Sequence, residues 1–117
     1  MATIRDVIQA LSSRSGVQTV ILLGRDGLPI DSVCHDGIDP DNIAALVPSI
    51  VDACNEVGQV TGQGDLKTCA VETEGGFTLV TGIGSDIILG LFVTPEANVG
   101  TLLYELRRYR TAIAELL

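Results

Sequence analysis

The stretch from Gly16 to Val33 constrains the fold of this 117-residue chain more than any other part of the sequence. Val20 to Leu23 are apolar at consecutive positions, so both faces of this predicted strand are buried and other elements cover the sheet on both sides. Asp26-Gly27 predicts a tight turn, because glycine reaches positive φ without steric cost. Pro29 lacks the N–H that a sheet ladder requires, which places the second strand of this hairpin at a sheet edge. The hairpin therefore indicates architecture rather than chemistry.

The composition limits the classes of protein to which the chain can belong. Its length and 46% hydrophobic content predict a single domain over residues 1–117. Fifteen acidic residues against seven basic ones give a net charge of −8, which repels nucleic acid and anionic membrane surfaces. Three widely spaced cysteines are typical of reduced thiols rather than of a disulfide framework. Because neither a signal sequence nor a membrane-spanning run is present, we expect a cytoplasmic protein that binds no nucleic acid and inserts into no membrane.

The order of elements follows from apolar periodicity and from cap and turn signals. Thr3 and Asp6 resemble a capping box, Asp39-Pro40 opens a second helix, and Asn98 opens the last one. The predicted order is αββαβββα: a helix at 4–14, the hairpin at 16–33, a helix at 40–60, strands at 65–73, 76–81 and 86–93, and a helix from 98 onward. Neither repeats nor linkers interrupt it.

The second predicted helix carries a wider apolar arc than one buried face requires. Apolar residues cover roughly half of its circumference, namely Ile43, Ala44, Leu46, Val47, Ile50, Val51, Ala53, Cys54 and Val57. A wide core stripe and a helix-pairing dimer seam explain this arc equally well. Pro48 lies inside the helix, where it lacks an N–H and clashes with the carbonyl of Ala44, so we expect a kink or a break there.

The cysteines and the single histidine are the candidates for chemistry. Cys34, His35 and Asp36 are consecutive, and with Cys54 and Cys69 they suggest a metal site or a thiol nucleophile. The sequence contains no C-x-x-C or H-x-x-H spacing, which argues against zinc. We expect the thiols to be small core residues and His35 to be a solvated loop residue. We therefore predict no catalytic residue, no metal site and no cofactor.

The glycines and the arginines of the last helix suggest anion binding. Gly82-Ile-Gly84 connects two predicted strands and Lys67 precedes a strand, whereas a phosphate loop enters a helix, so we expect no nucleotide site. Arg107, Arg108 and Arg110 have two interpretations. They form a solvated face that stabilises the negative end of the helix, or they contact an acidic partner. We favour the solvated face.

Four features in order resemble the roadblock/LC7 family: the hairpin ending Gly-Leu-Pro-Ile-Asp-Ser, the Ala-Ala-Leu helix, the strand meander, and Asn98-Val-Gly100 before an Arg-rich helix. The resemblance covers nearly the whole chain. It implies an α+β sandwich, in which a five-stranded antiparallel sheet has the second helix on one face and the first and third on the other. It also implies a homodimer in which the third strands pair into one continuous sheet beside paired second helices. The interface residues implied are Ile43, Ala44, Val47, Val51, Cys54, Leu66, Thr68 and Ala70.

The resemblance also implies a function. Roadblock dimers bind Ras-like small GTPases, and bacterial polarity-type members stimulate GTP hydrolysis without an arginine finger. The short acidic chain looks like a prokaryotic member, so we expect a GTPase-binding platform that is not itself an enzyme. The expected contact residues on the exposed side of the second helix are Ser49, Asp52, Asn55, Glu56 and Gln59. The alternative is a structural adaptor without influence on nucleotide hydrolysis, and an enzyme acting through Cys34 and His35 is a distant third.

Overall fold

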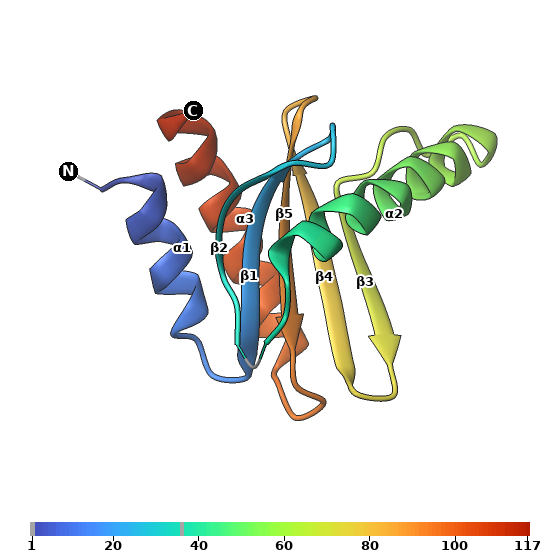
Figure 1. Cartoon of the computed structure of the whole chain (residues 1–117). Helices are drawn as coiled ribbons and strands as arrows, with labels where there is room; N and C mark the ends of the chain where they lie inside the picture. Colours follow the sequence, from blue (N-terminus) through green and yellow to red (C-terminus); the bar gives the residue numbers. More distant parts are fainter. Residues whose placement is uncertain (1, 36) are drawn as a thin grey trace.

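A computed structural model describes residues 2–35 and 37–117, so Asp36, beside the Cys34-His35 pair, lies outside the described residues. The chain forms the predicted order of elements (Figure 1). These are α1 (Ile4–Ser12), β1 (Val17–Gly24), β2 (Pro29–Val33), α2 (Pro40–Val60), β3 (Thr68–Thr73), β4 (Gly76–Ile83), β5 (Ile87–Val93) and α3 (Val99–Leu116). The predicted α+β class is confirmed.

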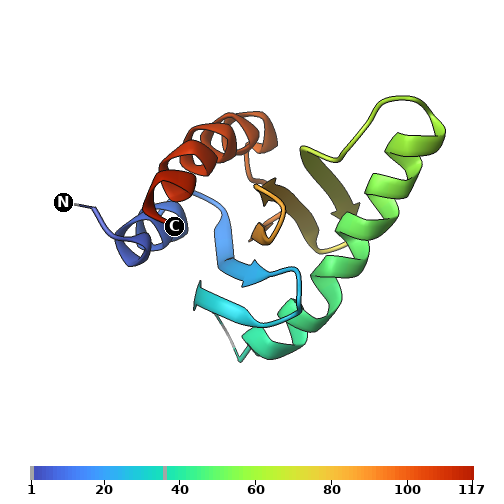
Figure 2. The same ribbon diagram turned by 90° about the horizontal axis from the view of Figure 1, so that it is seen from above.

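The five strands form one antiparallel sheet in the order β2-β1-β5-β4-β3. The strand that begins at Pro29 lies at one edge, as its missing N–H predicts, and β3 lies at the other edge. Helix α2 covers one face of the sheet, and α1 and α3 cover the other face (Figure 2). This arrangement confirms the predicted sandwich.

Strand β1 is buried on both faces, as its unbroken apolar run predicts. Val20 and Leu22 belong to the core cluster beneath α1 and α3. Ile21 and Leu23 belong to the second cluster, beneath α2. The two cores are therefore separated by the sheet itself, and β1 contributes alternate side chains to each.

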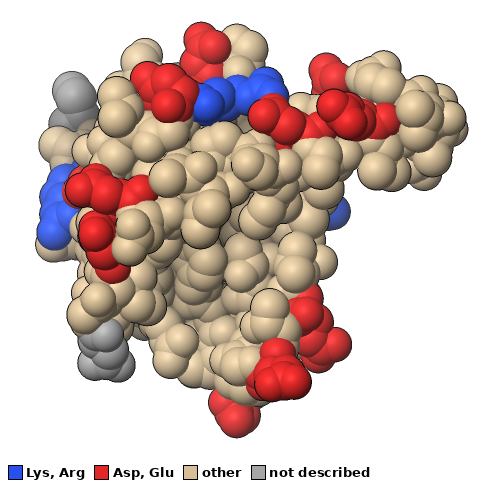
Figure 3. Space-filling model, turned by 45° about the vertical axis from the view of Figure 1, so that its right-hand side comes forward, with Lys and Arg blue, Asp and Glu red and all other residues tan. Residues whose placement is uncertain are grey.

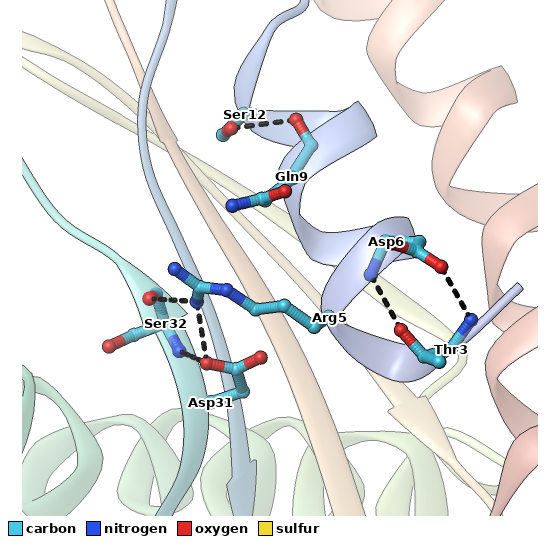
Figure 4. Close-up of polar contacts among 7 residues, drawn as sticks. All are labelled: Thr3, Arg5, Asp6, Gln9, Ser12, Asp31 and Ser32. Carbon is cyan, nitrogen blue, oxygen red and sulfur yellow. Dashed lines mark hydrogen bonds and ion pairs between the residues drawn. The ribbon is translucent and has the colours of Figure 1, made fainter.

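Polar caps fix the starts of the helices. In α1 the backbone N–H of Asp6 donates to Thr3 Oγ1 at 3.2 Å and the N–H of Thr3 donates to the Asp6 carboxylate at 2.9 Å (Figure 4). Arg5 leaves the same helix to donate to Asp31 at 2.7 Å, which ties α1 to β2 (Figure 4). Helix α1 ends at Ser12, two residues before the predicted end. The Ser12 hydroxyl donates back to a carbonyl of the last turn, an alternative to continuing the helix.

Helix α2 remains one helix of 21 residues through Pro48, so the predicted break is wrong. Asp39 caps it by accepting from the Asp41 N–H at 2.9 Å. The Ala44 carbonyl, which has no N–H donor at position 48, faces the β1–β2 turn, where a Cβ built on Gly27 would lie 3.5 Å from that oxygen. The turn glycine, with φ of +88°, thus lets the hairpin approach the helix at the proline.

The start of β3 differs from the prediction by three residues, because residues 61–67 form a loop held by α2. The N–H groups of Gln63 and Gly64 both donate to the Gly58 carbonyl, at 2.8 and 3.0 Å. The N–H of Leu66 donates to Asn55 Oδ1 at 2.7 Å. Bonds to α2 replace ladder bonds in this segment, so the strand begins only at Thr68.

Candidate protein-binding surface

An apolar stripe on α2 is exposed to solvent. Leu46, Val57 and Val60 have relative accessibilities of 70%, 57% and 85%, and Ile50 and Ala53 lie between them at half-buried and exposed positions. The spacing from Leu46 to Val60 is that of one helix face. We call these five residues the α2 stripe. Because α2 is only partly covered by its own sheet, the stripe accounts for the part of the wide arc that the sheet does not bury.

The opposite part of the arc is core. Ala44, Val47 and Val51 have accessibilities of 4% or less and pack against Ile21, Val80 and neighbouring residues of the sheet. These three side chains, predicted for the dimer interface, therefore belong to the core of the single chain. Ile43 and Leu66, from the same prediction, are half-buried at the margin of that core.

The uncharged surface continues from the α2 stripe onto the sheet. Val71 on β3 is 36% exposed, and Thr78 and Phe92 on the adjoining strands are half-buried on the same face. In Figure 3 a broad tan area lies below the ridge of α2, whereas acidic and basic side chains gather along the top of that ridge and acidic side chains lie at the lower margin. Exposed apolar side chains that gather in one patch, as in the α2 stripe, are typical of protein-contact sites.

The polar side of α2 holds the five predicted partner-contact residues, and these differ in whether they already have a partner within the chain. Asp52 pairs with Arg25 of the β1–β2 turn at 2.8 Å. Asn55 accepts from the Leu66 N–H, and Gln59 donates to Asp65 at 2.9 Å, so both hold the loop after α2. Ser49 and Glu56 are exposed on the same side. Loop anchoring thus explains Asn55 and Gln59 without a partner.

The two sheet edges differ in how well they are covered. Beside β2 lies α1, and Arg5 of that helix bonds both the Asp31 carboxylate and the Ser32 carbonyl. Strand β3 carries Thr68 and Ala70, both predicted for the interface, along an edge where no further strand follows in the sheet. An unpaired edge presents a row of N–H and C=O groups to another chain. The β3 edge is therefore the open one.

A pair of thiols joins α2 to β3. The sulfur atoms of Cys54 and Cys69 lie 3.7 Å apart, and both side chains are half-buried. Burial is the first cause and the hydrogen bond with Cys54 the second cause of a raised pKa for the Cys69 thiol. A raised pKa lowers the fraction of thiolate, so Cys69 is less nucleophilic near neutral pH than an exposed thiol.

Cys34 and His35 lie elsewhere, after the end of β2. The exposed His35 ring donates through Nδ1 to the Gln18 carbonyl, in agreement with its prediction as a loop residue. Within residues 2–35 and 37–117, no three His, Cys, Asp or Glu side chains converge as metal ligands would. No helix of the described chain combines the length and apolar character needed to cross a membrane.

The Roadblock/LC7 domain family model matches residues 3–92, which is most of the sheet and both of its first two helices. The chain belongs to the Roadblock/LC7 family. A relative from Methanocaldococcus jannaschii, the uncharacterised protein MJ0310, is 26% identical over 102 residues, which cover 87% of this chain and 89% of the relative.

Solved structures share the same fold. A Roadblock/LC7 domain from Streptomyces avermitilis superposes with a TM-score of 0.86 at 24% identity, covering 96% of this chain and 95% of that one. MglB of Myxococcus xanthus gives a TM-score of 0.86 at 18% identity, with 94% and 90% covered. At these identities the likeness concerns the fold.

Two features of this Roadblock/LC7 chain were missed from the sequence. The exposed stripe includes Leu46, Ile50, Ala53 and Val57, all recognised as part of the apolar arc but not as its solvent-facing side. The helical spacing also contains Val60, which extends the stripe by one turn. Knowing where the sheet meets the helix was necessary to separate the two sides of the arc.

The second missed feature is a hollow of about 540 Å³ lined by Lys67, Arg107 and Arg110 with Thr68, Gln63 and Asp65. The arginines do not stabilise the end of α3, because the helix continues to Leu116 and has no basic residue in its last turn. Lys67 and the arginines are separated by forty residues of sequence, so only the fold brings them together.

Proposed function

We propose that this protein is a homodimeric platform that binds a Ras-like small GTPase. The observation that carries the proposal is the exposed α2 stripe on a chain of the Roadblock/LC7 family. A stripe with side chains as exposed as Leu46 and Val60 gains hydrophobic free energy when another surface covers it. A second copy of the chain offers the same stripe, as a twofold interface requires.

The dimer surface consists of the α2 stripe and the outer edge of β3. Thr68 and Ala70 lie on that edge, and Cys54 joins helix and strand at the margin between them. Ile43 and Leu66 border the surface, whereas Ala44, Val47 and Val51 support it from the core. Strand pairing satisfies the free backbone groups of β3, and contact between the two helices covers the stripes.

The GTPase contacts the polar side of α2, which a dimer formed through the stripe leaves in solvent. Ser49, Asp52 and Glu56 form this surface, and Asn55 and Gln59 hold the loop behind it. In this proposal the chain binds and orients the GTPase, and none of its side chains takes part in the bond-making step of GTP hydrolysis. Any change in the rate of GTP hydrolysis would act through the residues of the GTPase.

The test measures binding to the small GTPase encoded nearest to this gene, loaded with a non-hydrolysable GTP analogue or with GDP. We expect one nucleotide state to bind about tenfold more tightly than the other, and Glu56→Arg to weaken that binding by about tenfold. The matched control is Glu96→Arg, the same charge change on the exposed β5–α3 loop, which we expect to bind as the wild type does.

Two results would count against the platform. Equal retention of both nucleotide states, with an intact dimer, would leave the structural adaptor as the better account. Equal losses for Glu56→Arg and Glu96→Arg would place the contact away from α2. Size-exclusion chromatography of both variants shows whether the dimer itself survives each change.

A further inference from the structure

The basic hollow lies on the α3 face of the β3 edge. Thr68 pairs with Thr81 in the sheet, and its hydroxyl donates to the Thr81 hydroxyl at 3.3 Å. Arg110 of α3 donates to the same Thr81 oxygen at 3.4 Å. Thr68, Ala70 and Glu72 alternate with Cys69 and Val71 along the strand, so these three side chains share the α3 face.

The cations of this hollow are concentrated in an otherwise acidic molecule. The ion pairs of the described chain use Arg5, Arg14 and Arg25, and none involves Lys67, Arg107 or Arg110. Asp65 also lines the hollow, but its carboxylate accepts from Gln59. The hollow therefore has room and positive charge for a further carboxylate.

The ladder between β3 and β4 determines which residues of β3 point their backbone N–H and C=O groups toward the open edge of the sheet. The N–H of Gly82 in β4 donates to the Lys67 carbonyl, so Lys67, just before β3, and Gly82 are a hydrogen-bonded pair of the antiparallel ladder. Because such pairs alternate along an antiparallel ladder, odd-numbered residues of β3 bond to β4. Thr68, Ala70 and Glu72 then direct their N–H and C=O groups to the open edge.

A second copy can pair with this edge in few registers. A twofold axis normal to the sheet keeps each residue on its own face, so paired residues differ by an even number. When Ala70 pairs with the partner's Ala70, Thr68 pairs with the partner's Glu72. The backbone groups of Thr68, Ala70 and Glu72 all point to the open edge, so each of these residues can bond the partner strand. Centring the pair on Val71 instead would place Glu72 opposite the methyl group of Ala70 and use fewer outward-facing groups.

We infer that Glu72 of one protomer docks at the hollow lined by Lys67, Arg107 and Arg110 of the other, and that this contact fixes the register of β3 pairing. The inference rests on the proposed homodimer. Glu72 is exposed in the single chain, and in the Ala70-centred register it lies opposite Thr68, which lines the hollow. Twofold symmetry makes the contact twice, once at each end of the strand pair.

The test uses charge reversal on each side of the contact and measures dimer dissociation by analytical ultracentrifugation. Glu72→Arg adds a fourth cation to the hollow, and we expect it to raise the dissociation constant about tenfold or more. Arg107→Glu repels the partner's Glu72, and we expect at least a threefold rise. Arg108→Glu and Glu96→Arg are the matched controls, and each should stay within about twofold of the wild type.

Mixing the two reversed chains gives the decisive readout. In a heterodimer of Glu72→Arg with Arg107→Glu, each end of the strand pair again brings opposite charges together. At one end the introduced arginine faces the introduced glutamate, and at the other end the unchanged Glu72 faces the unchanged Arg107. Native mass spectrometry of an equimolar mixture should show heterodimers well above the half expected from random pairing. A random mixture, or dissociation constants for both variants equal to that of the wild type, would overturn the contact.

A further variant separates this contact from folding and from dimerisation itself. Glu72→Gln keeps the size of the side chain, and we expect it to flatten the rise of the dissociation constant with salt that the wild type shows. An unchanged salt dependence would overturn the inference even if the reversed variants unfold. A wild-type chain that is monomeric would instead overturn the proposed homodimer, whereas a wild-type dimer indifferent to Glu72 would overturn only the contact.

Discussion

Asn55 shows at the scale of one residue why exposure on a helix wheel does not establish a partner contact. Its wheel position is polar, which favoured a contact with another protein. In the folded chain its Oδ1 accepts from the Leu66 N–H at 2.7 Å in a partly buried position. A helical wheel describes the positions within one helix only. It cannot show that the loop after α2 folds back so that Leu66, eleven residues later, bonds to Asn55.

Replacing Asn55 should therefore destabilise the chain itself. Asn55→Ala leaves the Leu66 N–H without its acceptor, and we expect the free energy of unfolding to fall by about 1–2 kcal/mol. Ser49→Ala, at an exposed position of the same helix, should change it by less than about 0.5 kcal/mol. Urea unfolding at one fixed protein concentration measures both. Equal stability of the two variants would show that the Asn55 bond contributes nothing.

Cys69 gives a prediction for pH. Burial and the neighbouring Cys54 raise the pKa of its thiol above the ordinary value of 9.0. In the folded chain the thiol therefore keeps its proton to higher pH, and the thiolate that reacts with iodoacetamide forms at higher pH than in the unfolded chain. We expect the alkylation rate of Cys69, followed by mass spectrometry, to keep rising above pH 9.0.

The control is the same chain in concentrated urea, where burial and the Cys54 contact are lost. Its profile for Cys69 should level off at lower pH than that of the folded chain. Superposable profiles in the two conditions would show that neither burial nor Cys54 acts on this thiol.

At the scale of elements, local signals predicted most of the fold. Thr3, Asp39 and Asn98 each cap the helix assigned to them, because a cap depends on residues within one turn. The start of β3 was not predictable in this way. It depends on the Gly58 carbonyl receiving two N–H groups from a loop, a tertiary contact without a periodic pattern.

Gly58 is the element-scale test of that loop. A Cβ at this position would lie 1.9 Å from the Gly64 oxygen, so the loop between α2 and β3 must shift to admit a side chain. We expect Gly58→Ala to lower the free energy of unfolding by about 2–3 kcal/mol. A Cβ on Gly82 meets no atom within 4 Å, so Gly82→Ala should change it by less than about 0.5 kcal/mol. Similar losses from both glycines would contradict the close approach.

At the scale of the whole molecule, the width of an apolar arc was readable from the sequence and its orientation was not. The arc is set by spacing along α2, but which part faces the sheet depends on where the helix crosses it. Val47 and Val51 proved to be core, and Leu46 and Val57 proved to be surface. The basic hollow was likewise hidden, because Lys67 and Arg107 meet only after the sheet has formed.

The central claim is that a second copy covers the α2 stripe, and sedimentation equilibrium tests it most directly. Val57→Asp places a charge on an exposed stripe position, so it should weaken the dimer by about tenfold or more while the single chain stays folded. Thr111→Asp, on the exposed side of α3, is the matched control and should stay dimeric. The account predicts that the wild type at micromolar concentration has about twice the 12.3 kDa mass of one chain. A wild type that sediments as a single chain would contradict it.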